Sequence, residues 1–248
     1  MNDANDENIE IDLPVGIKRR WFGDIRSTHL LAQLRMTRYA MYTTSLVDHS
    51  QYLLDNLARF FPRLDELTMT DATAGIGGNS RIFAGVFRKT FCIEINRKSA
   101  EIMDHNFRLL GIRGRTKIIN INYLRVMHLL KQDIIFLDPP WGGINYKKQK
   151  CADLYLYSEY GPVNVATLVA DYLADRAKII IIKAPPHFNY LSVMDRFQYV
   201  EVLKIMKSSE RVSYHLVILS NILPKEPLTS SRVLSTADYR SVIRYLKK

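Results

Sequence analysis

Blocks of apolar and polar residues alternate along the middle of this chain, a pattern that predicts alternating strands and helices. Short apolar runs predict strands at residues 66–71, 89–94, 116–122, 133–138 and 177–183. Amphipathic stretches predict helices around residues 80–86, 98–110, 123–130 and 163–174. The runs 134–137 and 179–182 are apolar throughout, so we expect both faces of these strands to be covered. The pattern predicts an α/β fold with a doubly wound parallel sheet.

The end of the chain predicts a different strand pairing. Residues 199–206 and 212–219 both have strand character, and only residues 207–211 separate them. So short a connection cannot make a parallel crossover, so we expect an antiparallel hairpin. A mostly parallel sheet that ends in such a hairpin is typical of the Rossmann-like class I methyltransferase fold, whereas dinucleotide-binding dehydrogenases usually stay parallel.

The segments that flank this sheet suggest four regions. We expect an acidic disordered tail at residues 1–15, a helical N-terminal extension at 16–62, the α/β domain at 63–224 and a C-terminal tail at 225–248. Within the extension, residues 46–61 form an amphipathic run that Thr44 or Ser45 could cap and that Pro62 follows. A short helix from Thr236 onward is expected in the last region.

Charge is unevenly distributed along the 248 residues. The formal net charge is +10, yet residues 1–12 hold five acids and no base, so the rest carries about +15. Such an excess favours a polyanionic partner, although a basic enzyme without a nucleic-acid role fits equally well.

Cysteine usage and hydropathy limit the class of protein. The two cysteines, Cys92 and Cys151, form no C-x-x-C pair, which argues against a structural zinc site or a disulfide framework. The acidic start is unlike a signal peptide, and no apolar run approaches the length of a membrane span. We expect a soluble intracellular protein without a metal site or a membrane partner.

A glycine-rich turn follows the first predicted strand, with the sequence Asp-Ala-Thr-Ala-Gly-Ile-Gly-Gly-Asn at residues 71–79. NAD, FAD and S-adenosylmethionine sites all use such a turn. Asp71 would repel a pyrophosphate but suits the ammonium of S-adenosylmethionine. Glu94, at the next strand end, could accept the ribose hydroxyls, and Asn122 with Tyr123 could hold the adenine. Each of these residues alone could instead be a helix cap or a solvated strand end. The candidate cofactor residues of the turn are Asp71, Thr73, Ala74, Gly75, Gly77, Gly78 and Asn79, and Asn79 or Ser80 could cap the helix that follows.

The run Asp138-Pro139-Pro140-Trp141 follows a buried strand and carries the candidate chemistry. The exocyclic amine of a nucleobase is a poor nucleophile because its lone pair is delocalised into the ring. Two acceptors on its hydrogens, the Asp138 carboxylate and the Pro139 carbonyl, would steady the charge that develops as it attacks a methyl sulfonium. Asp138 could also accept the proton that is lost. Trp141 would stack the base, with a cation–π contribution for 7-methylguanine; the alternative is a core aromatic.

Three basic segments are candidates for substrate phosphates, although solvated side chains explain each of them equally simply. Lys183 ends the fifth predicted strand, at the sheet edge where ligands bind in this architecture. Tyr146 and the lysines at positions 147, 148 and 150 follow the tryptophan turn. Arg20 belongs to a third segment, with Lys18, Arg19 and Trp21.

From Asp71 to Lys183 the chain resembles the trimethylguanosine synthase family. The resemblance lies in residues 71–79, in I-E-I-N at 93–96, in F-L-D-P-P-W-G-G-I-N-Y at 136–146 and in I-K-A-P at 182–185. It implies methylation of the guanine N2 amine of 7-methylguanosine caps, with S-adenosyl-L-methionine as the cofactor and capped RNA as the partner. It also implies that Trp141 stacks the methylated guanine, that Glu94 is the acidic strand end, and that Thr44 reaches the cofactor. Asp138 departs from the family, which often has serine there.

Two other functions stay open. The Asp-Pro-Pro-Trp motif also occurs in enzymes that methylate the adenine N6 amine of DNA or RNA. Many of these enzymes flip the base out of a duplex and need a further recognition domain. A catalytically silent scaffold of a capping complex is a third possibility. We expect a monomer, located in the nucleus if the source is cellular and in the host cytoplasm if it is a large DNA virus.

Overall fold

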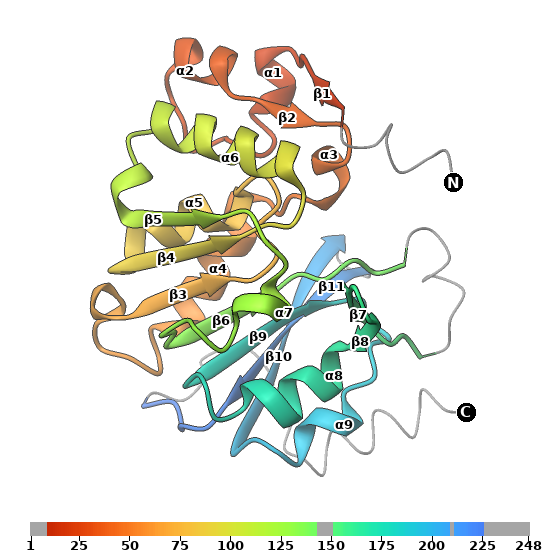
Figure 1. Cartoon of the computed structure of the whole chain (residues 1–248). Coiled ribbons are helices and arrows are strands. Elements are labelled where there is room, and N and C mark those ends of the chain that lie inside the picture. The colour runs from red at the N-terminus through yellow and green to blue at the C-terminus, as the bar shows by residue number, and fades with distance from the viewer. Residues whose placement is uncertain (1–8, 143–150, 209–210, 226–248) are drawn as a thin grey trace. The chain divides into compact units, whose positions relative to one another are not determined.

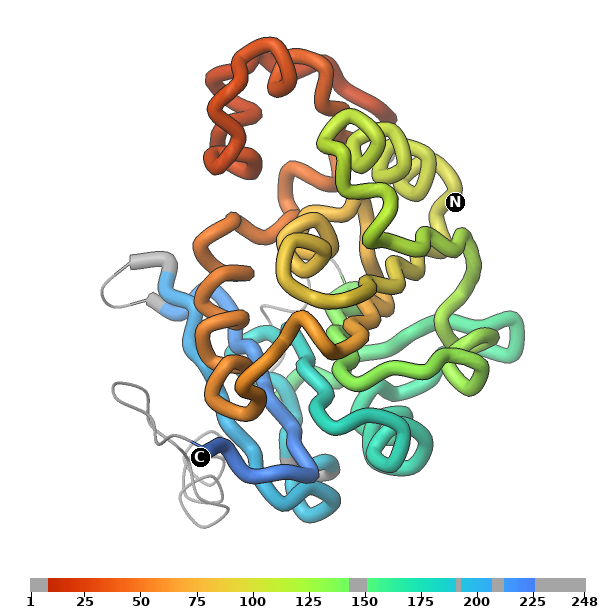
Figure 2. Tube along the Cα trace, turned by 90° about the vertical axis from the view of Figure 1, so that its left-hand side faces the viewer, coloured from red at the N-terminus to blue at the C-terminus, as the bar shows by residue number. Residues whose placement is uncertain are grey.

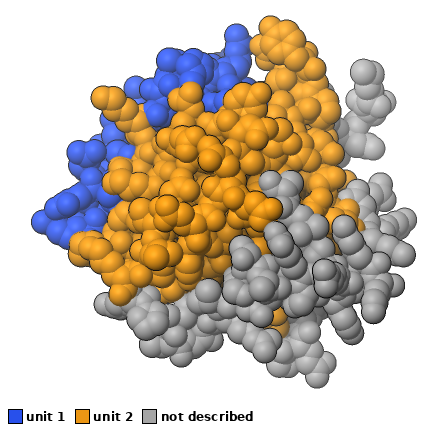
Figure 3. All heavy atoms as spheres, turned by 90° about the horizontal axis from the view of Figure 1, so that it is seen from below, with its two compact units in different colours: residues 1–58, 63–130 blue, residues 59–62, 131–248 orange. Residues whose placement is uncertain are grey.

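The computed structural model describes residues 9–142, 151–208 and 211–225, which fall into two compact units (Figure 3). The first unit comprises Met1–Ala58 and Arg63–Leu130, and the second comprises Arg59–Pro62 and Lys131–Lys248. The short segment Arg59–Pro62 belongs to the second unit, and the four regions expected from the sequence stay a prediction.

Three parallel strands form the sheet of the first unit, in the order β3 (Thr68–Asp71), β4 (Lys89–Ile93) and β5 (Thr116–Ile119) (Figure 1). Helix α5 (Gly78–Val86) connects β3 to β4, and α6 (Arg97–Leu109) with the 3-10 turn η2 (Arg113–Arg115) connects β4 to β5. Helix α6 begins where the side chain of Asn96 accepts a hydrogen bond from the Ser99 N–H. Its apolar face packs against the sheet through Met103 and Phe107, in a cluster with Cys92.

Short elements make up the N-terminal extension. In chain order they are β1 (Glu10–Ile11), α1 (Val15–Lys18), α2 (Thr28–Gln33), β2 (Met36–Thr37), α3 (Ala40–Thr43) and α4 (Val47–Leu57), followed by the 3-10 turn η1 (Leu64–Glu66). Helix α4 begins after Leu46 without a side-chain cap, so the caps expected from Thr44 and Ser45 are wrong. Strand β1 pairs antiparallel with β2, and Glu10 forms ion pairs with Arg35 and Lys98, so this part of the expected disordered tail is ordered.

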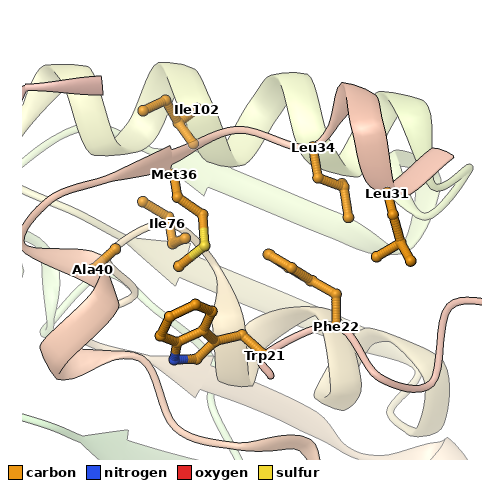
Figure 4. Close-up of a cluster of buried hydrophobic side chains, with 8 residues drawn as sticks. All are labelled: Trp21, Phe22, Leu31, Leu34, Met36, Ala40, Ile76 and Ile102. Atoms are coloured by element: carbon orange, nitrogen blue, oxygen red, sulfur yellow. The ribbon is translucent and has the colours of Figure 1, made fainter. Parts of the chain in front are cut away.

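The extension has its own hydrophobic cluster on one side of α6 (Figure 4). Trp21, Phe22 and Met36 meet Ile102 of α6 and Ile76 of the glycine-rich turn there. The extension therefore packs against both the turn and the helix. Figure 2 shows the red chain of the extension beside the yellow-green turns of α6. Asn106 of α6 also exchanges two hydrogen bonds with the backbone of Arg35.

The second unit contains four strands in the order β10 (Tyr199–Ser208), β11 (Arg211–Ser220), β9 (Ile179–Ala184) and β6 (Ile134–Leu137). Strands β6 and β9 are parallel, whereas β11 is antiparallel to both β9 and β10. Between β6 and β9 lie a small hairpin of β7 (Tyr155–Ser158) and β8 (Gly161–Asn164), the short helix α8 (Val165–Thr167) and the π-helix η4 (Leu168–Leu173). Helix α9 (Leu191–Met194) follows β9.

The seven strands β3–β6 and β9–β11 make a mostly parallel sheet with an antiparallel hairpin, which confirms the predicted α/β class. The hairpin of β7 and β8 was not predicted. A helix was expected from residue 163, but Asn164 caps α8 by accepting from the Ala166 N–H at 2.8 Å, so the helix begins later. The helix expected beyond Thr236 lies outside the described residues.

Within the described ranges, no helix has both the length and the apolar character that crossing a bilayer requires. The same residues contain no group of three or more histidine, cysteine or acidic side chains arranged to hold a metal ion.

Candidate functional site

The glycine-rich turn after β3 has a backbone that requires glycine. Gly75 and Gly77 have φ angles of 56° and 86°, in the left-handed region that other residues rarely adopt. A Cβ on Gly77 would also lie 2.6 Å from the ring of Phe107 in α6. Gly77 is the N-cap of α5, so the turn leads directly from the strand end into a helix N-terminus. Such a turn lets a ligand approach the backbone closely.

The side chains expected to cap α5 have other partners, so that expectation is wrong. Asn79 lies inside the first turn of the helix, and its Oδ1 accepts a hydrogen bond from Ser50 at 2.8 Å. Ser80 is buried, and its hydroxyl donates to the Asp71 carboxylate at 2.6 Å. Asp71 ends β3 and is only 1% exposed. The Ser80 hydroxyl, in the first turn of α5, therefore orients the Asp71 carboxylate. The contact of Asp71 with the methionine ammonium stays a prediction.

Thr44 brings the N-terminal extension to the turn. It is the C-cap of α3, where its N–H donates to the Ala40 carbonyl at 2.9 Å. Its methyl group lies against Gly78 so closely that a Cβ on this glycine would collide with it. Thr44 is therefore beside the glycine-rich turn, and its contact with the cofactor stays a prediction.

Glu94 directly follows β4 and binds the same turn. Its Oε2 accepts from the Gly75 N–H at 2.7 Å, and its Oε1 accepts from the Asn96 N–H at 2.6 Å. Burial raises the pKa of the Glu94 carboxyl, and the backbone hydrogen bonds oppose this shift. Asn120 supports the segment from β5 by donating to the carbonyls of Glu94 and Ile95 at 2.7 and 3.1 Å. Asn120 was not predicted as a site residue, because nothing in the sequence marks its hydrogen-bond partners.

The open side of the turn fits the adenosine part of S-adenosylmethionine. A Cβ on Gly75 would meet no atom within 4 Å, although its N–H is bound by Glu94. Ala74 holds the turn by donating to the Ile93 carbonyl at 2.8 Å, and Thr73 beside it is half-buried. A carboxylate has about four lone-pair sites, so Glu94 can accept ribose hydroxyls in addition to its two backbone donors.

The structure gives less support to the expected adenine contacts. Asn122 caps α7 (Tyr123–Val126), since its Oδ1 accepts from the Leu124 N–H at 3.1 Å. Tyr123 is 2% exposed, so its ring presents little surface on which an adenine could stack. The roles assigned to these two residues remain predictions.

In the second unit, Asp138 and Lys183 follow the last register pair of two neighbouring parallel strands, Leu137 of β6 with Ile182 of β9. Their side chains form an ion pair in which Lys183 Nζ donates to Asp138 Oδ2 at 2.7 Å. The Asp138 side chain is 18% exposed and the Lys183 side chain 7%. Lys183 is thus not a solvated lysine but the buried partner of the candidate catalytic carboxylate, and its contact with a substrate phosphate stays a prediction.

The burial of Asp138 affects its titration. Desolvation raises the pKa of its carboxyl above the ordinary value for aspartate, although the Lys183 ammonium opposes this shift. A carboxylate with a raised pKa is a better proton acceptor than a solvated one.

Trp141 lies next to this ion pair. Pro139 is buried, Pro140 is exposed, and the Trp141 side chain is half-buried. The indole N–H donates to the Lys183 carbonyl at 3.4 Å. Tyr214 of β11 packs edge-on against the indole with ring centroids 6.3 Å apart, and Lys183 Nζ lies 4.9 Å from the Tyr214 ring. Tyr214 was missed in the sequence analysis because only the pairing of β9 with β11 brings it here.

The remaining candidates for substrate contacts are Tyr146, the lysines that follow it, and Arg20. Tyr146 and the lysines at 147, 148 and 150 fall outside the described residues. Arg20 is exposed, with its guanidinium 5.7 Å from the Trp21 ring. The basic patch expected around it is wrong in two positions: Trp21 is buried in the core cluster, and buried Lys18 donates to the Ala32 carbonyl at 2.8 Å.

Similar proteins and structures include one viral and two bacterial examples. Protein L320 of Acanthamoeba polyphaga mimivirus, which is uncharacterized, is 26% identical over 211 residues, covering 76% of this chain and 80% of that protein. A candidate methyltransferase of Porphyromonas gingivalis W83 has a similar fold, with a TM-score of 0.56 and 16% identity over 91% of this chain. This chain spans 62% of the length of that structure. An RNA methyltransferase of Salinibacter ruber, solved with S-adenosyl-L-homocysteine, has a TM-score of 0.49 and 10% identity, covering 76% of this chain and 98% of that one.

A family profile matches the part of the chain that contains most of the candidate site. The profile described as RNA cap guanine-N2 methyltransferase matches residues 66–189, half of the chain, from before β3 to the segment after β9. The match includes the glycine-rich turn, Glu94, Asp138, Trp141 and Lys183. The chain therefore belongs to the RNA cap guanine-N2 methyltransferase family, and the cofactor of its class I methyltransferase fold is S-adenosyl-L-methionine.

Proposed function

We propose that the protein methylates the exocyclic N2 amine of the 7-methylguanosine cap of RNA. The observation that carries the proposal is the arrangement after β6 and β9, where the Asp138 carboxylate, held by Lys183, lies in a run with the half-buried Trp141. An acceptor and an aromatic face are the two features needed to hold a flat base by its amine. Membership of the family supports guanine as that base.

Residues of the first unit are proposed to hold the cofactor. Glu94 would accept the ribose hydroxyls, and the open backbone at Gly75 would lie against the adenosine. Asp71 would balance the charge of the methionine ammonium, with Thr44 and the turn residues up to Asn79 around it. When bound, the cofactor supplies an electrophilic methyl group that leaves its sulfonium for the attacking nitrogen.

Asp138 and Pro139 are proposed to prepare the amine. Their oxygens accept the two N2 hydrogens, so the lone pair is drawn out of conjugation with the ring and becomes available to form the new N–C bond. The methylated nitrogen then loses one proton, which Asp138 accepts. The raised pKa of the Asp138 carboxyl favours this proton transfer, while the Lys183 ammonium favours the ionised form of the carboxyl and so opposes the shift. Trp141 would stack the positively charged purine.

Capped RNA is the proposed partner, and the net charge of +10 is consistent with a polyanion. The mimivirus relative favours the viral alternative for location, in the host cytoplasm. The adenine N6 amine stays an alternative substrate, because Asp138 departs from the serine that the family often has.

The two tryptophans of the chain permit a direct test of stacking. Trp21 is 5% exposed in the core cluster, whereas Trp141 is half-buried, so added ligand should change the fluorescence of Trp141 alone. We expect 7-methylguanosine triphosphate to quench the intrinsic fluorescence of the protein and Trp141→Phe to remove the quenching. Guanosine triphosphate, which lacks the positive charge on the base, should quench much less.

Cofactor binding provides the control for this test. Calorimetry should give Trp141→Phe and the unmodified protein nearly equal affinities for S-adenosylmethionine, because no cofactor contact is assigned to the indole. Quenching that persists in Trp141→Phe would contradict stacking on Trp141. A parallel loss of cofactor affinity would instead mean that the indole is structural.

A further inference from the structure

The ion pair of Asp138 and Lys183 places an acceptor and a donor side by side at the end of β6 and β9. Lys183 Nζ lies 2.7 Å from Asp138 Oδ2, and both side chains are mostly buried. Burying two charges is costly unless they are paired with good geometry, and a serine in place of Asp138 would need no ammonium beside it. The pair therefore goes beyond what a simple acceptor for an amine requires.

Tyr214 fixes the position of the ammonium relative to the indole. Its ring lies 4.9 Å from Lys183 Nζ and packs edge-on against Trp141, whose N–H in turn donates to the Lys183 carbonyl. Both the head group and the backbone of Lys183 are thus tied to the residue proposed to stack the base. A purine on this indole would have the carboxylate and the ammonium near its edge.

The order of donors and acceptors along that edge distinguishes the purines. Guanine presents the N2 amine and N1–H as neighbouring donors, followed by O6 as an acceptor. Adenine presents N1 as an acceptor and its N6 amine as a donor, the reverse order. A carboxylate accepts only, and an ammonium donates only, so the pair has the polarity that complements guanine.

We propose that the Asp138–Lys183 pair determines base specificity, with Asp138 accepting from N1–H and the N2 amine of guanine while Lys183 donates to O6. The inference rests on the proposed function and extends it, since it assigns to Lys183 a base contact rather than a phosphate contact. Adenine would direct its N6 amine at the ammonium and its N1 lone pair at the carboxylate, and both contacts repel.

The test compares two cap analogues that both carry a C2 amine able to accept the methyl group. One contains 7-methylguanine, and the other contains 7-methyl-2,6-diaminopurine, in which an amine replaces O6 and N1 carries no hydrogen. We expect the unmodified protein to prefer the guanine analogue by about tenfold or more in kcat/KM, because buried polar groups reject a mismatched edge. Lys183→Met should reduce this preference several-fold, and Lys183→Gln, which keeps an N–H donor, should retain more of it.

The matched control is Lys178→Met. Lys178 forms an ion pair with Asp133 at 2.9 Å, at the opposite ends of the same two strands, and its side chain is 50% exposed. Its loss should leave the preference between the two analogues unchanged. Thermal melting and cofactor calorimetry of each variant separate a folding defect from a change in recognition.

Two failures can be told apart. If the unmodified protein methylates neither analogue, nor a capped RNA, the proposed function fails. If it methylates the 7-methylguanine analogue but Lys183→Met keeps the full preference, the base contact assigned to Lys183 is wrong. Should Lys183→Met not fold, the preference of the unmodified protein and of Lys183→Gln decides, and equal rates on both analogues would overturn the inference.

Discussion

Asp138 is the residue on which the proposed chemistry depends. Burial raises the pKa of its carboxyl, and Lys183 only partly opposes the shift. Because the ionised form must accept the amine hydrogens, the rate should fall on acidification at a higher pH than the ordinary pKa of aspartate would give.

The measurement is the pH profile of kcat/KM with and without Asp138→Asn. The amide should lower kcat by about a hundredfold and remove the acidic limb, while the affinity for S-adenosylmethionine stays within about twofold. Lys183→Met should move the limb to higher pH, since the ammonium that favours the carboxylate is lost. An acidic limb that is identical in Asp138→Asn would contradict the role of this group.

His215 affects stability rather than chemistry. It lies in β11 beside Tyr190, whose hydroxyl is 2.5 Å from its Nδ1. Burial, with further contributions from Lys204 and His187, lowers the pKa of its imidazole to about 4 from 6.5. The unfolded chain therefore binds a proton between these values and the folded protein does not.

The free energy of unfolding should consequently fall as the pH is lowered from about 6.5 to about 4. Above pH 6.5 the contribution of His215 should not change with pH. The contribution is about 3 kcal/mol in the free energy of unfolding. Urea unfolding at a series of pH values measures it, and His215→Gln should show a correspondingly weaker pH dependence. Equal slopes in the two proteins would show that His215 does not titrate in this way.

At the scale of elements, one guanidinium links α5 to the segment between α1 and α2 of the N-terminal extension. Arg81 of α5 donates to both carboxylate oxygens of Asp24 at 2.7 and 2.8 Å and to the Trp21 carbonyl at 2.9 Å. Burial raises the pKa of the Asp24 carboxyl, but Arg81 outweighs it, and the net direction is downward. The two partners differ in exposure, since the side chain of Arg81 is 6% exposed and that of Asp24 is 40% exposed.

The loss of Asp24 and the loss of Arg81 should therefore lower the free energy of unfolding by different amounts. Asp24→Ala leaves a buried guanidinium without its carboxylate and should cost about 2–4 kcal/mol in the free energy of unfolding. Arg81→Met leaves a carboxylate that reaches water, so it should cost less. Chemical denaturation of the two variants and of the double variant checks the order. A larger loss for Arg81→Met would mean that its packing over Phe22, 5.2 Å away, matters more than the charge pair.

Elements that are determined by the residues within them, such as apolar strands and glycine turns, could be predicted from the sequence. The apolar runs that became β6 and β9 and the short connection of β10 to β11 sufficed for the sheet class, and the glycine-rich turn required glycine where expected. The predicted caps of α5 are wrong, because the side chains of Asn79 and Ser80 bind Ser50 and Asp71, which are distant from them in sequence. For the same reason the pairing of Lys183 with Asp138, the position of Tyr214 and the support from Asn120 needed the structure.

For the whole molecule, the family match covers residues 66–189, so most of the candidate residues fall within it, including Asp71, Glu94 and Asp138. The extension before it and the hairpin of β10 and β11 lie outside the match, yet Thr44 and Tyr214 come from them. The glycine-rich turn and the Asp-Pro-Pro-Trp run lie inside the match, so the family profile covers the residues proposed for the chemistry.

Methyl transfer to a defined set of nucleic acids shows which base the protein modifies. The protein is incubated with methyl-labelled S-adenosylmethionine and, separately, with RNA bearing a 7-methylguanosine cap, RNA with an unmethylated cap, uncapped RNA and duplex DNA containing adenine. We expect label in the first RNA alone, recovered after digestion as guanosine methylated at both N2 and N7. Label recovered as N6-methyladenine, or no transfer to any of the four by protein that binds the cofactor, would contradict it.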